Sequence, residues 1–319
     1  MTSTVAPSGP APAAPDAVDL GLPVVGSLSP SRAGDFMQCP LQYRLRTIDR
    51  LPQAPSPAAT RGTVVHAVLE RLFDLPAAER TPTAAAALLE PEWERLQAAE
   101  PEVAGMFAGE DDLAAWLVSA RGLLDAYFTL EDPRRLEPAR REELVEHVLP
   151  GGLRLRGIVD RLDVAPDGAV RVVDYKTGRA PGEAFEGKVL FQMKFYALVL
   201  WRTTGRVPAL LQLMYLGGSS SQGPEVLRYS PDERDLVATE RKLLALWEAI
   251  ERATQRRDFP PRVSRLCDWC DHKALCPAFG GTPPPWPERV PGPEEPLPHQ
   301  RRAVERAVAQ GAERLPQQG

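Results

Sequence analysis

Three residues near the middle of the chain have side chains suited to hydrolysing a phosphate ester. Asp160 precedes a tight turn at 166–168, and Asp174 and Lys176 follow that turn within the run DYKTG. Because side chains alternate along a strand, Asp174 and Lys176 project from one face, and the hairpin brings Asp160 near them. Carboxylates bind Mg²⁺ or Mn²⁺, which activates water for attack on phosphorus, and a lysine stabilises the developing negative charge.

The plainer alternative is that these are ordinary charged residues at the ends of strands. Lys176, however, is one of only five lysines among 38 basic residues, so a lysine inside this motif is less often accidental. The strand before Asp174 is also strongly apolar, and Asp160 lies one hairpin back. We therefore expect Asp160, Asp174 and Lys176 to be catalytic.

The elements that must position these residues follow from hydrophobic periodicity and turn residues. Strands are predicted at 144–149, 153–164, 169–175, 209–216 and 225–229. Helices are predicted from Ser29-Pro30 to about residue 46 and at 60–75, 83–130, 189–202 and 231–257. This order predicts an α/β or α+β protein with a central mixed β-sheet flanked by helices.

Composition divides the chain into a body and two tails. Residues 1–26 are rich in Ala, Pro, Gly and Ser, which predicts a disordered N-terminal tail. Residues 280–319 are predicted to form a Pro-rich linker and C-terminal tail. The folded body is predicted at 27–279, with a helical insertion at 83–130 and an irregular, cysteine-containing segment at 258–279.

Overall composition narrows the class of protein. The 319 residues are 43% hydrophobic and 25% charged, and they include no long uncharged apolar stretch or secretory signal pattern. We therefore expect a cytoplasmic protein without membrane association. The net charge of −5 argues mildly against non-specific nucleic-acid binding. No P-loop motif is present, which excludes an ATP-driven motor of that type in this sequence.

The four cysteines form a second pattern. Cys39 is distant from Cys267, Cys270 and Cys276, and a proline follows the last one. In a reducing compartment such cysteines are metal ligands or plain thiols more often than disulfides. Structural zinc usually draws on two short-spaced pairs, whereas three cysteines ending in Cys-Pro favour a [4Fe–4S] cluster, with zinc as the alternative. Such a cluster would clamp the two ends of the body together.

Taken together, these segments resemble the PD-(D/E)XK nuclease superfamily and, within it, the RecB-like exonucleases. The matching pieces are GIVDRLD, DYKTG, RGTVVHAVLE as a G-x-x-x-H helix and FQMKFYALVL as a Q-x-x-x-Y helix. FMQCP, together with the three later cysteines, resembles the iron-staple pattern of AddB-type proteins. The resemblance covers residues 29–277 and implies a restriction-endonuclease-like nuclease core in which the iron–sulfur clamp joins the N- and C-terminal ends.

The resemblance also implies roles for individual residues. It makes His66, Asp160 and Asp174 ligands of Mg²⁺ or Mn²⁺, with the Tyr175 carbonyl completing the set and Lys176 as the catalytic lysine. For His66 the alternative is a purely structural histidine on a helix.

Four further residues are implied more weakly. Gln192 and Tyr196 would lie along the DNA path or support the site, and core packing is their alternative. Glu146 is a supporting candidate on the strand before Asp160. Asp163 completes the D-R-x-D run, and its alternative role is an ion pair with a neighbouring arginine such as Arg161.

The function expected from this resemblance is a metal-dependent DNA nuclease. It would be an exonuclease acting on single strands or free ends in DNA repair or recombination, and a separate helicase is a candidate partner. One alternative is a non-catalytic DNA-binding or scaffold subunit that works with a helicase. The intact Asp160, Asp174 and Lys176 set argues against it. Another alternative is a nuclease of CRISPR adaptation, which shares the motifs.

Overall fold

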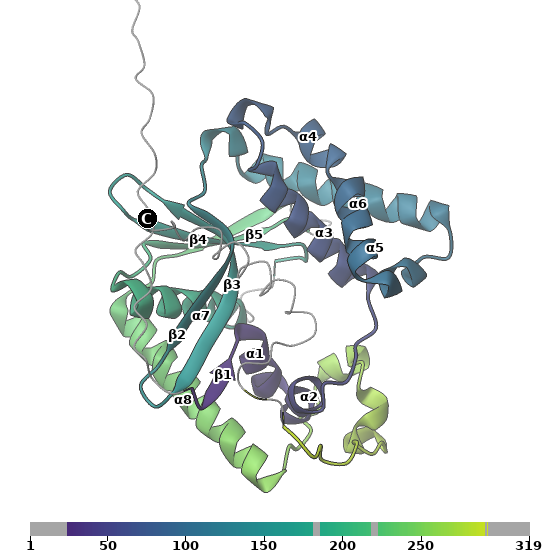
Figure 1. Cartoon of the computed structure of the whole chain (residues 1–319), viewed down its shortest axis with the longest axis vertical. Helices are drawn as coiled ribbons and strands as arrows, with labels where there is room; N and C mark the ends of the chain where they lie inside the picture. Colours follow the sequence, from purple (N-terminus) through teal and green to yellow (C-terminus); the bar gives the residue numbers. More distant parts are fainter. Residues whose placement is uncertain (1–23, 181–185, 218–222, 291, 293–319) are drawn as a thin grey trace, which may run out of the picture.

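The computed structural model describes residues 24–180, 186–217, 223–290 and 292. At the centre of this part of the chain lies a mixed six-stranded sheet with the order β1-β3-β4-β5-β6, in which β2 pairs with β3 (Figure 1). The strands are β1 (Gly26–Leu28), β2 (Arg140–Val148), β3 (Leu153–Val164), β4 (Val170–Lys176), β5 (Leu210–Tyr215) and β6 (Glu225–Tyr229). A mixed sheet flanked by helices confirms the predicted fold class.

The long strand β3 pairs along both of its edges. Antiparallel β2 follows one edge from Arg154 to Leu162. The other edge is divided, because β1 pairs in parallel with residues 153–155 and β4 pairs antiparallel with residues 161–164. Residues 156–160 have no partner on this edge among the described strands. The sheet is therefore open at the point where Asp160 lies.

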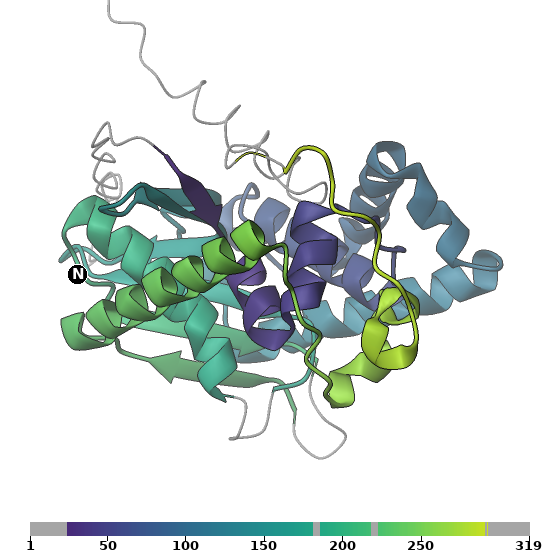
Figure 2. The ribbon, with the colours of Figure 1, turned by 90° about the horizontal axis from the view of Figure 1, so that it is seen from below.

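Helices cover both faces of the sheet (Figures 1 and 2). One face packs against α1 (Pro30–Gln38), α7 (Glu186–Thr204) and α8 (Glu233–Arg256), and the other packs against α3 (Pro57–Leu72), α4 (Pro82–Ala87), α5 (Leu89–Ala99) and α6 (Glu110–Leu130). Val172 of β4 belongs to the first core, whereas Val173 and Tyr175 belong to the second. Neighbouring strand residues thus point to opposite faces, as the period of two requires.

The helix predicted over 29–46 is interrupted at Cys39. α1 ends at Gln38, Cys39 is extended with φ −157°, and a short α2 (Pro40–Tyr43) continues into a π-helical turn at 44–48. Pro40 explains the break, because a proline disfavours helical backbone at the residue before it. The interruption places Cys39 at a corner between two helices.

Several boundaries differ from the sequence-based prediction. β2 begins at Arg140, four residues before the predicted start, and α3 begins at Pro57 because the Ser56 side chain accepts a hydrogen bond from the Ala59 N–H. β1 was not predicted and begins at the end of the supposed tail. Residues 1–23 and 293–319 lie outside the described residues. No described helix is long and apolar enough to cross a membrane.

The cysteine-containing segment after α8 consists of short 3₁₀ turns, at Arg265–Trp269, Lys273–Leu275 and Pro277–Phe279. It lies beside α2 in both views (Figures 1 and 2). Cys276 packs with Leu41 of α2 and with Leu45. The end of the folded body therefore meets its beginning, as the predicted clamp requires.

Candidate active site

The open stretch of β3 presents Asp160 to groups from three other elements. The backbone N–H of Tyr175 in β4 donates to Asp160 Oδ2 at 2.7 Å, and His66 Nδ1 of α3 lies 3.5 Å from Asp160 Oδ1. Glu142 of β2 stands opposite Asp160, because its neighbours Arg141 and Glu143 pair with Arg161 and Val159. One potential ligand atom from each of His66, Glu142 and Asp160 lies within 4.8 Å of the others.

Asp174 and Lys176 form the second half of the site, on the face of β4 that packs against α7. Lys176 Nζ lies 2.7 Å from Asp174 Oδ2 and donates to Gln192 Oε1 at 3.0 Å. Gln192 Nε2 in turn donates to Asp174 Oδ1 at 3.0 Å and lies 2.9 Å from the Tyr196 hydroxyl. Gln192 and Tyr196 are four residues apart on α7, so one helical turn presents both to the site.

Asp160 and His66 stabilise each other's charged forms. Burial opposes ionisation of Asp160, but the His66 charge and hydrogen bond and the Lys176 charge outweigh it, so the pKa of Asp160 is lowered. Burial likewise opposes protonation of His66, but Asp160 outweighs it and raises the pKa of His66 to about 9. At neutral pH His66 is therefore an imidazolium beside a carboxylate.

Asp174 and Lys176 behave differently from each other. Burial raises the pKa of Asp174 to about 6; Lys176 opposes that rise, whereas the negative charge of Asp160 adds to it. Burial acts to lower the pKa of Lys176, but Asp174 and Asp160 outweigh it, and the pKa is raised. Lys176 therefore stays charged, while Asp174 is the carboxylate whose ionised form this site tolerates least.

Comparison with known proteins identifies the family that this site belongs to. The model of the PD-(D/E)XK nuclease superfamily matches residues 27–277. The chain belongs to this superfamily. PD-(D/E)XK nucleases hydrolyse phosphodiester bonds with divalent metal ions, and the cluster of His66, Glu142 and Asp160 is of the kind that could bind one.

Two phage proteins are similar over most of their length. The Gene 69 proteins of Mycobacterium phages D29 and L5 are each 24% identical, over 286 and 290 residues, covering 79% of this chain and 96% of theirs. The crystal structure of SSO0001 has a TM-score of 0.37 at 15% identity, covering 81% of this chain and 89% of that one. The structure named "Putative exonuclease" from Eubacterium rectale has a TM-score of 0.48 at 14% identity, covering 86% and 92%.

The structure changes the set of residues nearest Asp160. Glu146, the supporting candidate from sequence, is exposed and lies opposite Arg156 in the β2–β3 ladder, four residues along β2 from the position opposite Asp160. Four residues of strand span about 13 Å, so Glu146 lies away from the site. Glu142 stands there instead. Sequence reasoning missed it because the β2–β3 register decides which acid faces Asp160; its backbone has φ 46°, unusual inside a strand.

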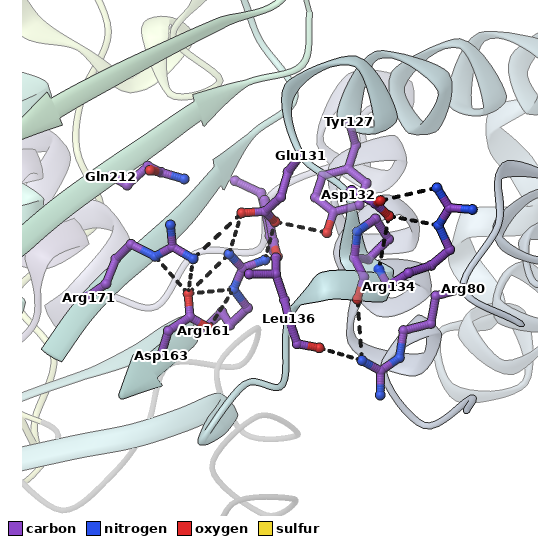
Figure 3. A network of polar contacts seen from close by, with 12 residues as sticks. Arg80, Tyr127, Glu131, Asp132, Arg134, Leu136, Arg161, Asp163, Arg171 and Gln212 are labelled. Carbon is purple, nitrogen blue, oxygen red and sulfur yellow. Dashed lines mark hydrogen bonds and ion pairs between the residues drawn. The ribbon is translucent and has the colours of Figure 1, made fainter. Parts of the chain in front are cut away.

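Asp163 lies in a separate polar network with Glu131, Arg161 and Arg171 (Figure 3). Its carboxylate is 3.1 Å from Arg161 Nε and 2.8 Å from Arg171 Nη2. Arg161 also donates to Glu131 at 2.6 and 2.8 Å and to the Tyr175 hydroxyl at 2.7 Å. This placement corresponds to the alternative role for Asp163, an ion pair with a neighbouring arginine, and not to a position on a DNA path.

The four cysteines line one narrow cavity between α2 and the 3₁₀ turns, and the Arg262 N–H donates to Cys39 Sγ at 3.4 Å. Among the described residues, three potential ligand atoms come within 4.8 Å of one another only at His66, Glu142 and Asp160, so the thiols are not gathered that tightly. Burial raises the pKa of Cys270, and the neighbouring cysteines Cys39 and Cys267 contribute to that rise.

Proposed function

We propose that this chain is a metal-dependent deoxyribonuclease of the RecB-like branch. The observation that carries the proposal is the meeting of Asp160, Asp174 and Lys176 beside residues 156–160 of β3, which have no partner on one edge among the described strands. Lys176 and Asp174 are held there by Gln192, which contacts both side chains. A cavity lined by Gln192, which contacts Asp174, and by Tyr196 offers room for a phosphodiester next to the site.

The donor set beside Asp160 fits a hard divalent cation. Two carboxylates and an imidazole suit Mn²⁺, and the carboxylates also suit Mg²⁺. Asp160, Glu142 and His66 would hold the ion, with Asp174 and the Tyr175 carbonyl as further ligands. The bound ion supplies Lewis acidity toward a phosphoryl oxygen and lowers the pKa of a water molecule. His66 must lose its proton to serve as a ligand.

Lys176 supplies positive charge where the reaction creates negative charge. Its ammonium group is fixed between Asp174 and Gln192, so it can donate to an oxygen of the scissile phosphate without reorganising. Gln192 has a positioning role, because its carbonyl accepts from Lys176 while its amide nitrogen donates to Asp174. The Tyr196 hydroxyl, near the same amide nitrogen, helps to fix which way the amide faces.

The substrate proposed is DNA with free single-stranded ends, and the reaction proposed is exonucleolytic shortening in repair or recombination. This substrate and this reaction are proposed because the motifs resemble those of RecB-like exonucleases. A separate helicase is the partner proposed on the same grounds.

The decisive experiment uses single-stranded DNA labelled at either end, with Mg²⁺ or Mn²⁺. We expect progressive shortening by the wild type and none by Lys176→Ala; comparing the two labels gives the polarity. Lys194→Ala is the matched control, because Lys194 is a partly buried lysine on the same helix α7 that pairs with Asp235 and has no contact with Asp174 or Gln192. Binding without cleavage by the wild type would contradict a nuclease and favour the DNA-binding subunit.

We further propose that the four cysteines hold a [4Fe–4S] cluster that clamps the ends of the body. Their convergence on one cavity supports this proposal, as does a donor set made entirely of thiols. A single zinc ion would need its sulfurs within about 3.8 Å of one another, given Zn–S bonds of about 2.3 Å. A cluster, being larger, holds its cysteines farther apart.

Anaerobically purified protein tests this assignment. We expect a brown protein with bound iron, and we expect Cys267→Ala to lose both the colour and part of the thermal stability. Asp268→Ala changes the neighbouring, exposed residue and should keep both. A colourless wild type with one equivalent of zinc would establish the alternative metal.

A further inference from the structure

A large cavity adjoins the candidate active site on the side of α1 and α8. Its volume is about 810 Å³, in the range of pockets that enclose a small-molecule ligand. It shares Gln192 and Tyr196 with the site, so the groups that orient Lys176 and Asp174 also form one wall. The other walls come from the start of α1, from β2 and β3, and from α8.

The floor of this cavity is the unpaired edge of β3. Gly157 lies there, and a Cβ at this position would come 2.6 Å from the Tyr196 ring and 3.4 Å from Pro30. Glycine therefore lets Tyr196 of α7 and Pro30 of α1 approach the strand closely at the cavity. The cavity continues the same gap in the sheet that presents Asp160.

Two cations face the cavity without a carboxylate partner. Arg156, half-buried on β3, and Lys242, exposed on α8, form no hydrogen bond or ion pair with the described residues. Lys242 Nζ lies 4.8 Å from the centre of the Phe191 ring, a cation–π contact. The acid in the lining, Asp35, is already paired with Arg46 at 2.7 Å. No other acid in the described lining is left to pair with these two cations, and Glu146, opposite Arg156 in the ladder, forms no ion pair with it.

Apolar side chains accompany these cations in the lining. Leu144, Ile158 and Phe191 offer surface for sugars and bases, while Ser29 and Ser31 add hydroxyl groups. Positive charge that neutralises phosphates, beside apolar surface that contacts bases, is the combination that binds single strands without sequence preference. The volume suits a short piece of one strand and not a duplex.

We propose that this cavity is the subsite for the single-stranded DNA next to the scissile phosphate, with Arg156 and Lys242 contacting its phosphates. This inference rests on the proposed nuclease function, because the strand would run from the cavity past Gln192 to Lys176. It assigns binding, and not chemistry, to the two cations.

The test measures binding separately from cleavage. A fluorescently labelled oligothymidylate is titrated with the full-length protein in EDTA, over a series of salt concentrations. For single strands, the slope of log K against log salt changes by about 0.7 for each phosphate contact. We expect Lys242→Ala and Arg156→Gln each to reduce the slope by about that amount, and the double variant by about twice as much.

Arg241→Ala is the matched control, because Arg241 precedes Lys242 on α8, is also exposed and does not line the cavity. We expect it to leave the slope unchanged. Lys242 lies on the helix surface, so its substitution leaves folding intact, and melting temperatures check Arg156→Gln. Folded variants that retain the wild-type slope would overturn the subsite.

The outcomes for the subsite and for the nuclease separate cleanly. If the wild type cleaves DNA and both cavity variants keep the full salt slope, the nuclease function is supported and the DNA subsite in the cavity is rejected. If the wild type never cleaves DNA but binds it with a salt slope that the variants reduce, the DNA subsite is supported and the nuclease function is rejected. Absence of DNA binding by the wild type overturns the subsite.

Discussion

Two clusters of buried charge lie back to back on the same two strands and behave in opposite ways. Asp160 and Asp174 belong to the candidate active site, whereas the adjacent residues Arg161 and Tyr175 belong to the network in Figure 3. In the network, Arg161 is 1% exposed and contacts Glu131, and the bond lowers the pKa of that carboxyl in spite of its burial.

The active-site cluster is buried to a similar degree but is not compensated in the same way. Asp174 is 2% exposed, and its pKa is raised to about 6 although Lys176 lies 2.7 Å away. A second carboxylate, Asp160, shares the site and works against its ionisation. Burial is thus common to both clusters, and the ratio of acids to bases distinguishes them. In the Arg161 network the charges balance, which favours stability. In the active-site cluster the carboxylates are in excess, which favours binding of a cation.

Replacing Arg161 should have the largest effect on stability. Arg161→Leu leaves the Glu131 carboxylate, 9% exposed, without its main partner, which typically costs about 3–5 kcal/mol of unfolding free energy, whereas Asp163 keeps Arg171. Urea denaturation measures the change. Arg134→Leu is the control, because Arg134 pairs with Asp132 in the same region but is exposed, and we expect little change from it. A loss no larger than the control's would show that the network is not a stabilising unit.

Replacing Asp174 should have the opposite pattern of effects to replacing Arg161: a large loss of activity and no loss of stability in metal-free buffer. Asp174→Asn should slow DNA cleavage by at least about 100-fold, the usual effect of removing a preorganised charged group. Because its folded pKa is raised, Asp174 contributes stability that is present below its ordinary value of 3.8 and is lost as the pH rises through about 6. In metal-free buffer, the wild type should therefore lose stability across this window.

The variant should lack that loss, because asparagine does not titrate. Melting temperatures recorded with EDTA between pH 4 and pH 7 give the comparison. If Asp174→Asn and the wild type follow the same curve, the carboxylate is better compensated than the geometry indicates.

Replacing Glu131 tests the network through its pH dependence. Its pKa lies below the ordinary 4.5, so the ionised carboxylate stabilises the fold above that pH and ceases to do so as the pH falls further. Glu131→Gln should lower the unfolding free energy by about 2 kcal/mol at pH 7, as for one charge-assisted hydrogen bond. The difference from wild type should shrink below pH 4.5; a constant difference would assign the effect to packing.

The smallest effect is expected at Tyr196. Tyr196→Phe removes the hydroxyl that lies 2.9 Å from Gln192 Nε2, which is worth about 1 kcal/mol, or roughly a fivefold fall in kcat. The DNA affinity measured in EDTA should change little, because the ring that lines the cavity stays in place. An equal loss in affinity would mean that the hydroxyl contacts DNA directly.

Local patterns account for the parts of the fold and site that the sequence predicted correctly. The strands around PGG and PDG, and the alternation that puts Asp174 and Lys176 on one face, depend on neighbours in the chain. The interruption at Cys39 also has a local signal, because Pro40 disfavours helical backbone at the residue before it.

Pairings between distant segments account for what was missed. Glu142 faces Asp160 only because of the β2–β3 register, and a run of several acids and bases on that strand gives no means of choosing among them. The Arg161 network depends on Glu131, which lies at the end of α6 and has no motif around it. Such contacts depend on how each helix packs against the sheet, and the hydrophobic periodicity of the sequence does not determine that packing.

The unpaired edge of β3 has a consequence for solubility. Free strand edges invite pairing with strands of other molecules, and proteins usually hide or interrupt them. Here the Tyr196 ring and Pro30 both pack closely over Gly157 and cover the strand there, which hinders a strand of another molecule from pairing with it. A larger residue at Gly157 would displace the Tyr196 ring and Pro30. It would put the protein at risk of self-association at the opening where we propose that DNA binds.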